Sequence, residues 1–226
     1  MNGLYLYALV DEEPGPPLGQ GLAGEPLRLV RSGGLLAVAG ERAARPAPGV
    51  HAFSEHDGTV RRLAERVPAL LPARFGEWFA DEQALADKLA PRARELGEAL
   101  ELVRGCVQMT LRVFGEPAAP DPPDEGEAEG GPGTRYLAER RREQERARSI
   151  PEIGPLRELL VPHFRAEKAE RRGTPPLLGT AYHLVPREAL AEYRAALERG
   201  CERLTGVRVQ ASGPWPPYAF APGATP

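Results

Sequence analysis

The side chains best suited to chemistry stand together in the tetrapeptide Ser-Glu-His-Asp at residues 54–57. A hydroxyl, an imidazole and a carboxylate are the components of a hydrolase triad, in which the imidazole takes a proton from the attacking oxygen. Triads are assembled by folding from separate parts of a chain, however, so consecutive residues rarely form one. We therefore interpret Ser54 as the N-cap of a helix that carries Val60, Leu63 and Val67 on one face, and we assign no catalytic residue.

A glycine pattern at residues 19–24 has the Gly-x-Gly-x-x-Gly spacing of dinucleotide-binding loops. Such a site requires the motif to open a helix, so that amides at the helix N-terminus face the pyrophosphate. Here Glu25 and Pro26 follow, and then the apolar segment Leu27–Val30, which predicts a strand. We interpret the glycines as loop composition and expect no cofactor. The four histidines do not have metal-ligand spacing either, so no metal site is expected.

Arginines occur in two settings where they would meet an anion. Arg74 lies among apolar residues in Leu-Pro-Ala-Arg-Phe-Gly at 71–76. An arginine in such a place usually pairs with a carboxylate or caps carbonyls, and the alternative is an enzyme that holds a small anion there. The charged segment Arg135–Arg148 is helix-prone, and its alternative interpretation is a nucleic-acid-binding stripe. We favour a solvated helix face and expect no nucleic acid, because an acidic segment adjoins these arginines and screens them.

The composition is that of an ordinary globular chain. With 226 residues, 42% of them hydrophobic, the chain forms one large or two small domains. A net charge of −3 gives no field that attracts nucleic acid or an acidic membrane. Cys106 and Cys201 stand far apart, and we expect reduced, buried thiols of a cytosolic protein. No apolar run approaches the roughly 18 residues that span a bilayer, and the first residues lack the basic start of a signal peptide.

Hydrophobic periodicity predicts the elements that position these residues. Leu4–Val10 is apolar on both faces, which is typical of a central strand covered on two sides. A hairpin around Gly33 and two helical stretches complete the first half. The second half begins with Cys106–Phe114, whose alternation predicts a half-buried strand. After it we expect an acidic loop over 116–133, a helical arm broken by prolines over 134–172, and then a strand, a helix and a final strand.

Both halves of this pattern predict the α+β class. We expect two small domains, 1–104 and 105–226, with mostly antiparallel sheets and helices packed on one face, as in ferredoxin-like variants.

The segment Gly-Pro-Trp-Pro-Pro-Tyr-Ala-Phe at 213–220 is neither a helix nor a central strand, because its three prolines fix φ and remove backbone donors. It should be stiff and extended, and it carries large rings at Trp215, Tyr218 and Phe220. We favour a strap that Trp215 and Tyr218 clamp over the core. The alternative is an arm that binds a partner.

Several short segments, taken in order, carry a family resemblance. They are Leu-Tyr-Leu-Tyr at 4–7, His56 ahead of Val60, the 71–76 segment, Gly-Thr-Arg-Tyr-Leu at 133–137, Ala-Tyr-His-Leu-Val at 181–185 and residues 213–220. Together they resemble the GvpF/GvpL family of gas vesicle proteins, and the last segment and 71–76 are the most specific. The chain departs from the family pattern at Glu77 and Trp78, where small or branched residues are common, and at Gln108, where a glutamate is common.

The resemblance implies an α+β accessory or minor structural component of gas vesicles without catalytic residues. It implies binding to the small hydrophobic shell protein of the GvpA type, and to other accessory proteins, so that the shell protein does not aggregate during vesicle nucleation. The expected location is the gas vesicle, and the cytoplasm during assembly. The motifs nominate as partner-binding residues Arg74, Phe75, Gly76, Trp78, Trp215, Pro216, Pro217, Tyr218 and Phe220.

Overall fold

The structure is a computed structural model that describes residues 2–116 and 149–223. Its internal contacts divide the chain into two compact units, Met1–Gln108 with Pro214–Pro226, and Met109–Gly213. Residues 214–223, expected in the second domain, therefore contact the first unit. The expected acidic loop over 116–133 and the first part of the helical arm, 134–148, lie outside the described residues except for Glu116.

The first unit is built around one fully buried strand. The strands are β1 (Gly3–Val10), β2 (Leu27–Ser32), β3 (Leu35–Arg42), β4 (Leu70–Pro72) and β5 (Trp78–Phe79). They pair antiparallel in the order β2-β3-β1-β4, and β5 also pairs with β1. Every residue of β1 is buried, as its two-sided apolar sequence predicts.

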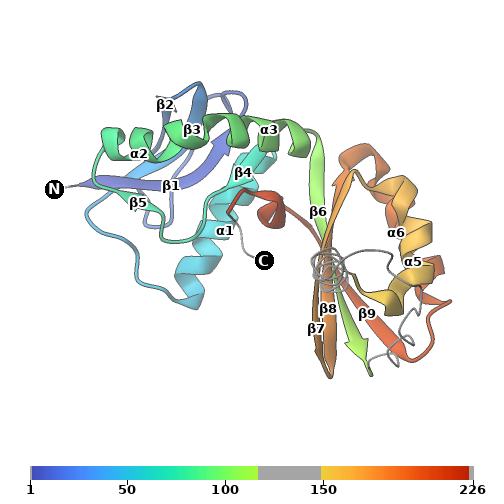
Figure 1. Cartoon of the computed structure of the whole chain (residues 1–226). Coiled ribbons are helices and arrows are strands. Elements are labelled where there is room, and N and C mark those ends of the chain that lie inside the picture. The colour runs from blue at the N-terminus through green and yellow to red at the C-terminus, as the bar shows by residue number, and fades with distance from the viewer. Residues whose placement is uncertain (1, 117–148, 224–226) are drawn as a thin grey trace, which may run out of the picture. The chain divides into compact units, whose positions relative to one another are not determined.

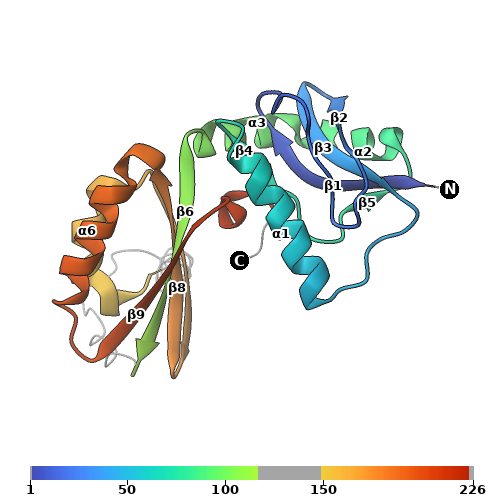
Figure 2. The same cartoon turned by 180° about the vertical axis from the view of Figure 1, so that it is seen from behind.

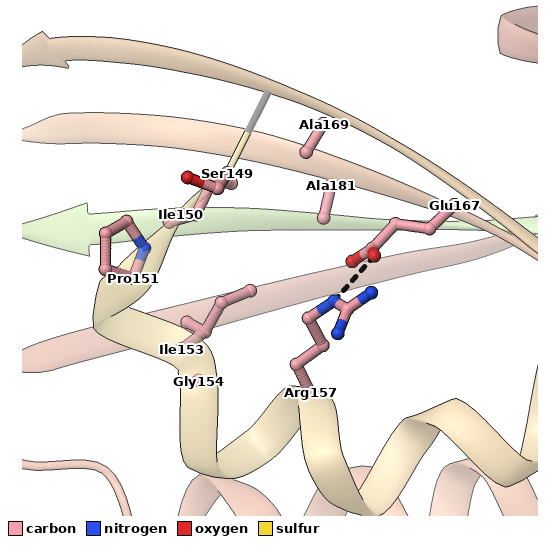
Figure 3. A pocket seen from close by; sticks show the side chains of 9 residues that line it. All are labelled: Ser149, Ile150, Pro151, Ile153, Gly154, Arg157, Glu167, Ala169 and Ala181. Atoms are coloured by element: carbon pink, nitrogen blue, oxygen red, sulfur yellow. Dashed lines mark hydrogen bonds and ion pairs between the residues drawn. The ribbon is translucent and has the colours of Figure 1, made fainter. Parts of the chain in front are cut away.

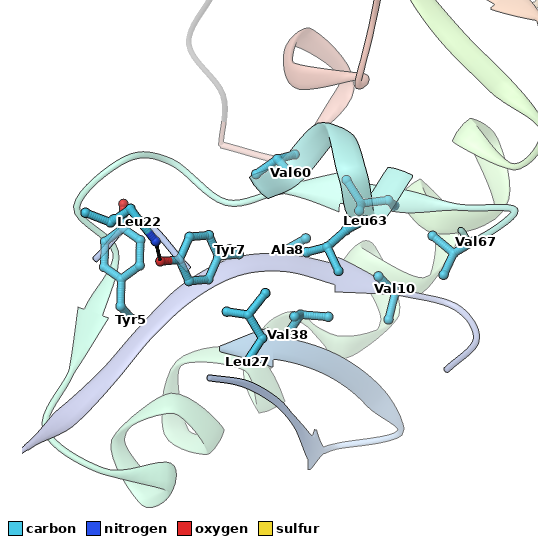
Figure 4. Packing of buried hydrophobic residues seen from close by; sticks show 11 residues of the cluster. Tyr5, Tyr7, Ala8, Val10, Leu22, Leu27, Val38, Val60, Leu63 and Val67 are labelled. Atoms are coloured by element: carbon cyan, nitrogen blue, oxygen red, sulfur yellow. Dashed lines mark hydrogen bonds between the residues drawn. The ribbon is translucent and has the colours of Figure 1, made fainter. Parts of the chain in front are cut away.

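Helices cover both faces of this sheet. They are α1 (Val50–Ala64), α2 (Glu82–Leu89) and α3 (Ala93–Val103). Figures 1 and 4 show α1 on one face and α2 with α3 on the other. On the α1 face, Tyr7 and Val10 of β1 pack against Val60 and Leu63, and this cluster forms the core (Figure 4). The sheet thus holds α1 at a fixed place above the aromatic side chains of β1.

Helix α1 begins earlier than the sequence predicts, and Ser54 is not its N-cap. The helix starts at Val50 after Gly49, which takes the N-cap position without a side-chain hydrogen bond. Ser54 lies exposed inside the helix. The expectation was wrong because a serine on a solvated helix face costs little, and because the preceding turn is already supported by the i, i+4 pair of His51 and Glu55, 3.3 Å apart.

The second unit has a ferredoxin-like order of elements, which confirms the expected α+β class. Its elements are β6 (Cys106–Gly115), α5 (Gly154–Leu160), β7 (Ala166–Thr174), β8 (Leu177–Pro186), α6 (Leu190–Cys201) and β9 (Val207–Trp215). The sheet order is β7-β8-β6-β9. Both helices lie on one face of the sheet (Figures 1 and 2). They approach closely at Gly200, where a Cβ would lie 2.3 Å from Leu156 Cδ1.

The predicted helical arm is only partly helical within the described residues. Helix α5 lies between short 3-10 turns at Pro151–Ile153 and Val161–His163, as the interrupting prolines predict. Residues 166–172, however, belong to strand β7, which pairs antiparallel with β8. That end of the arm was predicted wrongly because a charged edge strand has little hydrophobic alternation, whereas its partner β8 supplies the hydrogen bonds.

Strand β6 is buried on both sides in its first half, not half-buried as predicted. Gln108 is only 5% exposed, and its Oε1 accepts a hydrogen bond of 2.8 Å from the Ala219 amide. The C-terminal segment therefore covers Gln108, which belongs with that segment to the first unit, whereas the alternation predicted that this side chain faces solvent. Cys106 is a buried free thiol as expected, whereas Cys201 is only partly buried.

Candidate protein-binding surface

The first unit exposes a group of apolar side chains where α1 begins. Val50 is 88% and Phe53 48% exposed. The Phe53 ring lies 4.3 Å, centroid to centroid, from the ring of Phe75, which is in the turn between β4 and β5. The exposed Arg74 precedes Phe75 in the same turn. We call Val50, Phe53, Arg74 and the half-buried Phe75 the aromatic surface. Exposed apolar side chains that gather in this way mark protein-binding sites.

The turn protrudes because the chain leaves β1 and returns to it. Strand β4 pairs Pro72 with Ala8 of β1, and β5 pairs Trp78 with Tyr5 of the same strand. Between them the Glu77 amide donates to the Arg74 carbonyl over 3.2 Å, and Gly76 has a φ of +90°. A side chain at that position would be strained, so the turn requires glycine there. The motif at 71–76 thus fixes the backbone of the turn that carries the exposed Arg74 and the half-buried Phe75.

Two buried side chains hold the turn from below. The Gly76 amide donates to the Tyr5 hydroxyl over 3.1 Å, and that oxygen lies 2.9 Å from His56 Nδ1. The other ring nitrogen, His56 Nε2, lies 3.2 Å from the Ala73 carbonyl oxygen. A carbonyl only accepts, so Nε2 carries the proton and Nδ1 accepts from the Tyr5 hydroxyl. Burial lowers the pKa of His56, so the ring is neutral near pH 7.

The glycine-rich loop serves the same support and has no dinucleotide geometry. The Leu22 amide donates to the Tyr7 hydroxyl over 2.8 Å, and that hydroxyl donates to Glu25 Oε1 over 2.5 Å. A Cβ on Gly21 would lie 2.2 Å from the Tyr7 oxygen, which explains that glycine. Burial, together with the Glu25 hydrogen bond, raises the pKa of Tyr7. The loop leads into β2, and not into a helix, so the glycine spacing reflects its packing on Tyr7.

The C-terminal segment lies as a strap over the core, as favoured from the sequence. It is not extended throughout, because strand β9 ends at Trp215 and Tyr218–Phe220 form a short 3-10 turn. Pro216, Pro217 and Phe220 are buried, whereas Trp215 and Tyr218 are partly exposed. The Tyr218 hydroxyl donates to Asp57 Oδ1 on α1 over 2.9 Å, and burial raises its pKa.

The same carboxylate connects Tyr218 to Trp215. Asp57 Oδ2 pairs with Arg61 at 2.6 Å, and the Arg61 guanidinium lies 4.2 Å above the centre of the Trp215 ring. The strap therefore fixes the helix that carries Val50 and Phe53.

The structure brings only part of the nominated residues to the aromatic surface. Arg74, Phe75 and Gly76 are in the turn, and half-buried Trp78 follows it, where its Nε1 donates to the Arg42 carbonyl over 3.3 Å. The Arg74 side chain forms no hydrogen bond or ion pair among the described residues, in contrast to the expected carboxylate or carbonyl partner. The strap residues lie elsewhere on the same unit.

Sequence reasoning missed Val50 and Phe53. The available signal was an aromatic residue three positions before His56, on the solvent side of a helix whose start was placed too late.

The second unit contains a small cavity between α5 and the sheet (Figure 3). It has a volume of about 250 Å³, and apolar side chains of Ile150, Ile153, Ala169 and Ala181 line much of it. On one side Arg157 Nε pairs with Glu167 at 2.6 Å. Burial opposes the charge of Glu167, but hydrogen bonds from His183 and Arg157 lower its pKa overall. His183 also lies 2.7 Å from the Tyr193 hydroxyl, so these polar groups satisfy one another and serve packing.

Within residues 2–116 and 149–223, no group of three or more histidine, cysteine, aspartate or glutamate residues is arranged to hold a metal ion. None of the helices that the structure describes is long and apolar enough to cross a membrane.

These features define an α+β protein of two units that presents a supported apolar surface. The sequence profile described as "Gas vesicle synthesis protein GvpL/GvpF" matches residues 3–222. The chain therefore belongs to the GvpL/GvpF family of gas vesicle proteins. A curated relative, "Gas vesicle protein L" of Streptomyces sp. (strain CB03234), is 29% identical over 96% of this chain and 92% of its own length.

Two crystal structures share the fold. GvpF from Anabaena sp. PCC7120 superposes with a TM-score of 0.74 at 18% identity and covers 98% of this chain and 96% of its own. GvpF from Microcystis aeruginosa has a TM-score of 0.73 at 20% identity, with 97% and 98% covered. At identities this low, the likeness shows a common fold alone.

Proposed function

We propose that this protein is a non-catalytic assembly factor that binds the hydrophobic gas vesicle shell protein, of the GvpA type, and prevents its aggregation during vesicle nucleation. The observation that carries the proposal is the aromatic surface, whose exposed Phe53 and half-buried Phe75 rest on a hydrogen-bonded support. We place the protein at the gas vesicle, and in the cytoplasm during assembly, with other gas vesicle accessory proteins as further partners.

The physical argument concerns apolar surface. A subunit that lines a gas space must expose apolar area, and such area aggregates unless it is covered. The aromatic surface has little order left to gain on binding, because the turn is already fixed by Tyr5 and His56. Covering one phenylalanine side chain completely contributes about 1.5–3 kcal/mol. The free energy gained by covering two rings is modest. Such binding shields a shell subunit and still releases it to the growing vesicle wall.

The test is coexpression with the shell protein, followed by sedimentation to measure the soluble fraction of that protein. Phe53→Ser is expected to reduce the soluble fraction to near the level without any partner. Leu102→Ser is the matched control, because Leu102 is also exposed, at 40%, on α3 of the same unit. Full protection of the shell protein by a folded Phe53→Ser variant would contradict the proposed surface.

Two other functions remain as alternatives. The side chain of Arg74, which has no partner among residues 2–116 and 149–223, is the reason to consider an enzyme that acts on a small anion. If phosphate and small carboxylates do not shift the melting temperature of the wild-type protein, that reason is removed. Nucleic-acid binding through 135–148, which lies outside the described residues, predicts retention of DNA or RNA that weakens steeply with salt. Absence of retention at low salt would rule out nucleic-acid binding through this segment.

A further inference from the structure

His56 is a titratable side chain within the support of the aromatic surface, and its hydrogen bonds fit only the neutral form of the ring. The ring is 3% exposed. It stacks on Tyr7 at 5.5 Å between centroids, and Phe75 lies edge-on to it at 5.8 Å. Its two nitrogens are both in use, one as the acceptor for the Tyr5 hydroxyl and one as the donor to the Ala73 carbonyl.

We propose that Tyr5 and His56 are positioning residues for the aromatic surface and form an acid-sensitive latch. The neutral ring holds the turn Ala73–Gly76 in its projecting form, and protonation of the ring releases that turn. The consequence for binding rests on the proposed function, whereas the latch itself does not.

The hydrogen-bond inventory explains the release. A protonated His56 donates from both nitrogens, so Nδ1–H would face the Tyr5 hydroxyl. That oxygen already accepts from the Gly76 amide, and its own proton loses its acceptor when Nδ1 becomes a donor. The oxygen can accept from both groups, but its own buried proton is then left without an acceptor, and turning the hydroxyl toward a new acceptor weakens the Gly76 contact and frees the turn.

The charges around His56 do not compensate for a cation. Burial outweighs the carboxylate of Asp57, next to it on α1, which favours a charged ring but already accepts from Arg61 and Tyr218, so the pKa of His56 is lowered overall. Glu25, which reaches the neighbouring Tyr7, is engaged by that hydroxyl and by Arg42. The Arg42 guanidinium lies 5.9 Å from the centre of the Tyr5 ring and adds a positive charge on that side.

Release is confined to the turn. The Ala73 amide donates to the Tyr7 carbonyl over 2.9 Å, and the Leu6 amide donates to the Glu77 carbonyl over 2.9 Å. These bonds do not involve the imidazole, so β4 and β5 stay paired with β1. Acid therefore changes the presentation of Phe75 before it unfolds the unit.

The experiment measures the hydrogen-exchange protection of the Gly76 and Glu77 amides in the full chain, corrected for intrinsic exchange. It compares about pH 7.5 with a pH below the midpoint of the His56 ring titration, because burial lowers that pKa from the ordinary value of roughly 6.5. Protection in wild type is expected to fall at least about tenfold at the lower pH. His51→Gln, the control, removes an exposed histidine of the same helix and should fall equally. His56→Gln keeps a donor for Ala73 and should not change with pH, whereas Tyr5→Phe should be poorly protected at both.

Constant protection in wild type across this range would overturn the latch. An NMR titration of the His56 ring supports it only if its midpoint coincides with the loss of protection, and this readout needs no variant to fold. Binding of the shell protein at both pH values is measured in parallel. A latch that opens without any change in binding leaves the latch intact and contradicts the proposed binding surface.

Discussion

Tyr7 and Glu25 form a largely buried polar pair of the first unit, and each of them has several hydrogen-bond partners. The Tyr7 hydroxyl receives the Leu22 amide and donates to Glu25, whose other oxygen accepts from the Ala23 amide and pairs with Arg42 at 3.3 Å. A single hydroxyl therefore satisfies a loop amide and a carboxylate that solvent barely reaches. At this scale the proposed binding surface depends on buried residues that lie beneath it.

Tyr7→Phe is expected to destabilise the first unit by about 1–3 kcal/mol, because the buried Leu22 amide loses its acceptor. Tyr218→Phe also removes a tyrosine hydroxyl, but it leaves Asp57 paired with Arg61, so its cost should be about 0.5–1.5 kcal/mol. Tryptophan fluorescence during denaturant unfolding measures both, because the chain's two tryptophans, Trp78 and Trp215, belong to the first unit. Equal costs for the two variants would contradict this assignment.

The depressed pKa of His56 predicts the pH dependence of stability. The unfolded chain binds a proton at His56 below about pH 6.5, whereas the folded unit resists that proton until a lower pH. The free energy of unfolding should therefore fall as the pH drops below 6.5, by up to about 1.4 kcal/mol per pH unit, until the folded pKa is reached. His56→Gln should flatten this part of the curve, and a slope unchanged by that variant would place its origin elsewhere.

At the scale of elements, the strap and α1 act together. The strap contributes the buried Phe220 and the hydroxyl of Tyr218, and α1 contributes Asp57 and the exposed Phe53. The strap therefore influences the aromatic surface by fixing the helix on which Phe53 stands. Its rings need not contact a partner to matter for binding.

Phe220→Ala is expected to cost about 3–5 kcal/mol of first-unit stability, because it empties a buried site. Trp215→Ala should cost clearly less, since that ring is only partly buried and lies against Arg61. Both are measured by denaturant unfolding followed by circular dichroism, because Trp215 is itself a fluorescent reporter. A larger cost for Trp215→Ala would show that the cation–π contact, and not burial, holds the strap.

The elements whose burial is decided locally were predictable from the sequence. The two-sided run of β1 predicted a covered central strand, and the Gly33 turn predicted the hairpin of β2 and β3. Gln108 was not, because its burial depends on an amide more than a hundred positions away, at Ala219. The strand at 166–172 was hidden for a similar reason, since β7 is specified by its register with β8.

The candidate site was predictable in the same uneven way. Arg74, Phe75 and Gly76 follow from one short motif, because a contiguous turn needs only local residues. Phe53 joins them only through folding, when α1 lies across β1 and brings its ring beside Phe75. Tyr5 and His56, 51 positions apart in the sequence, meet for the same reason.

For the molecule as a whole, membership of the gas vesicle family and an uncovered apolar surface point to one activity. The residues from Pro214 onward belong to the first unit, which therefore combines an N-terminal and a C-terminal part of the chain. Within the described residues it presents aromatic side chains on a rigid support and no arrangement of metal-binding groups. We therefore expect the first unit to carry the contact with the shell protein.

The most direct test is photo-crosslinking in cells that assemble gas vesicles, with a photoreactive amino acid placed at Phe53 or, in a second variant, at the control position Leu102, which is also exposed. Crosslinks from position 53 to the shell protein, with few or none from position 102, are the predicted result. Crosslinks to the shell protein from position 102 but not from position 53 would contradict the account.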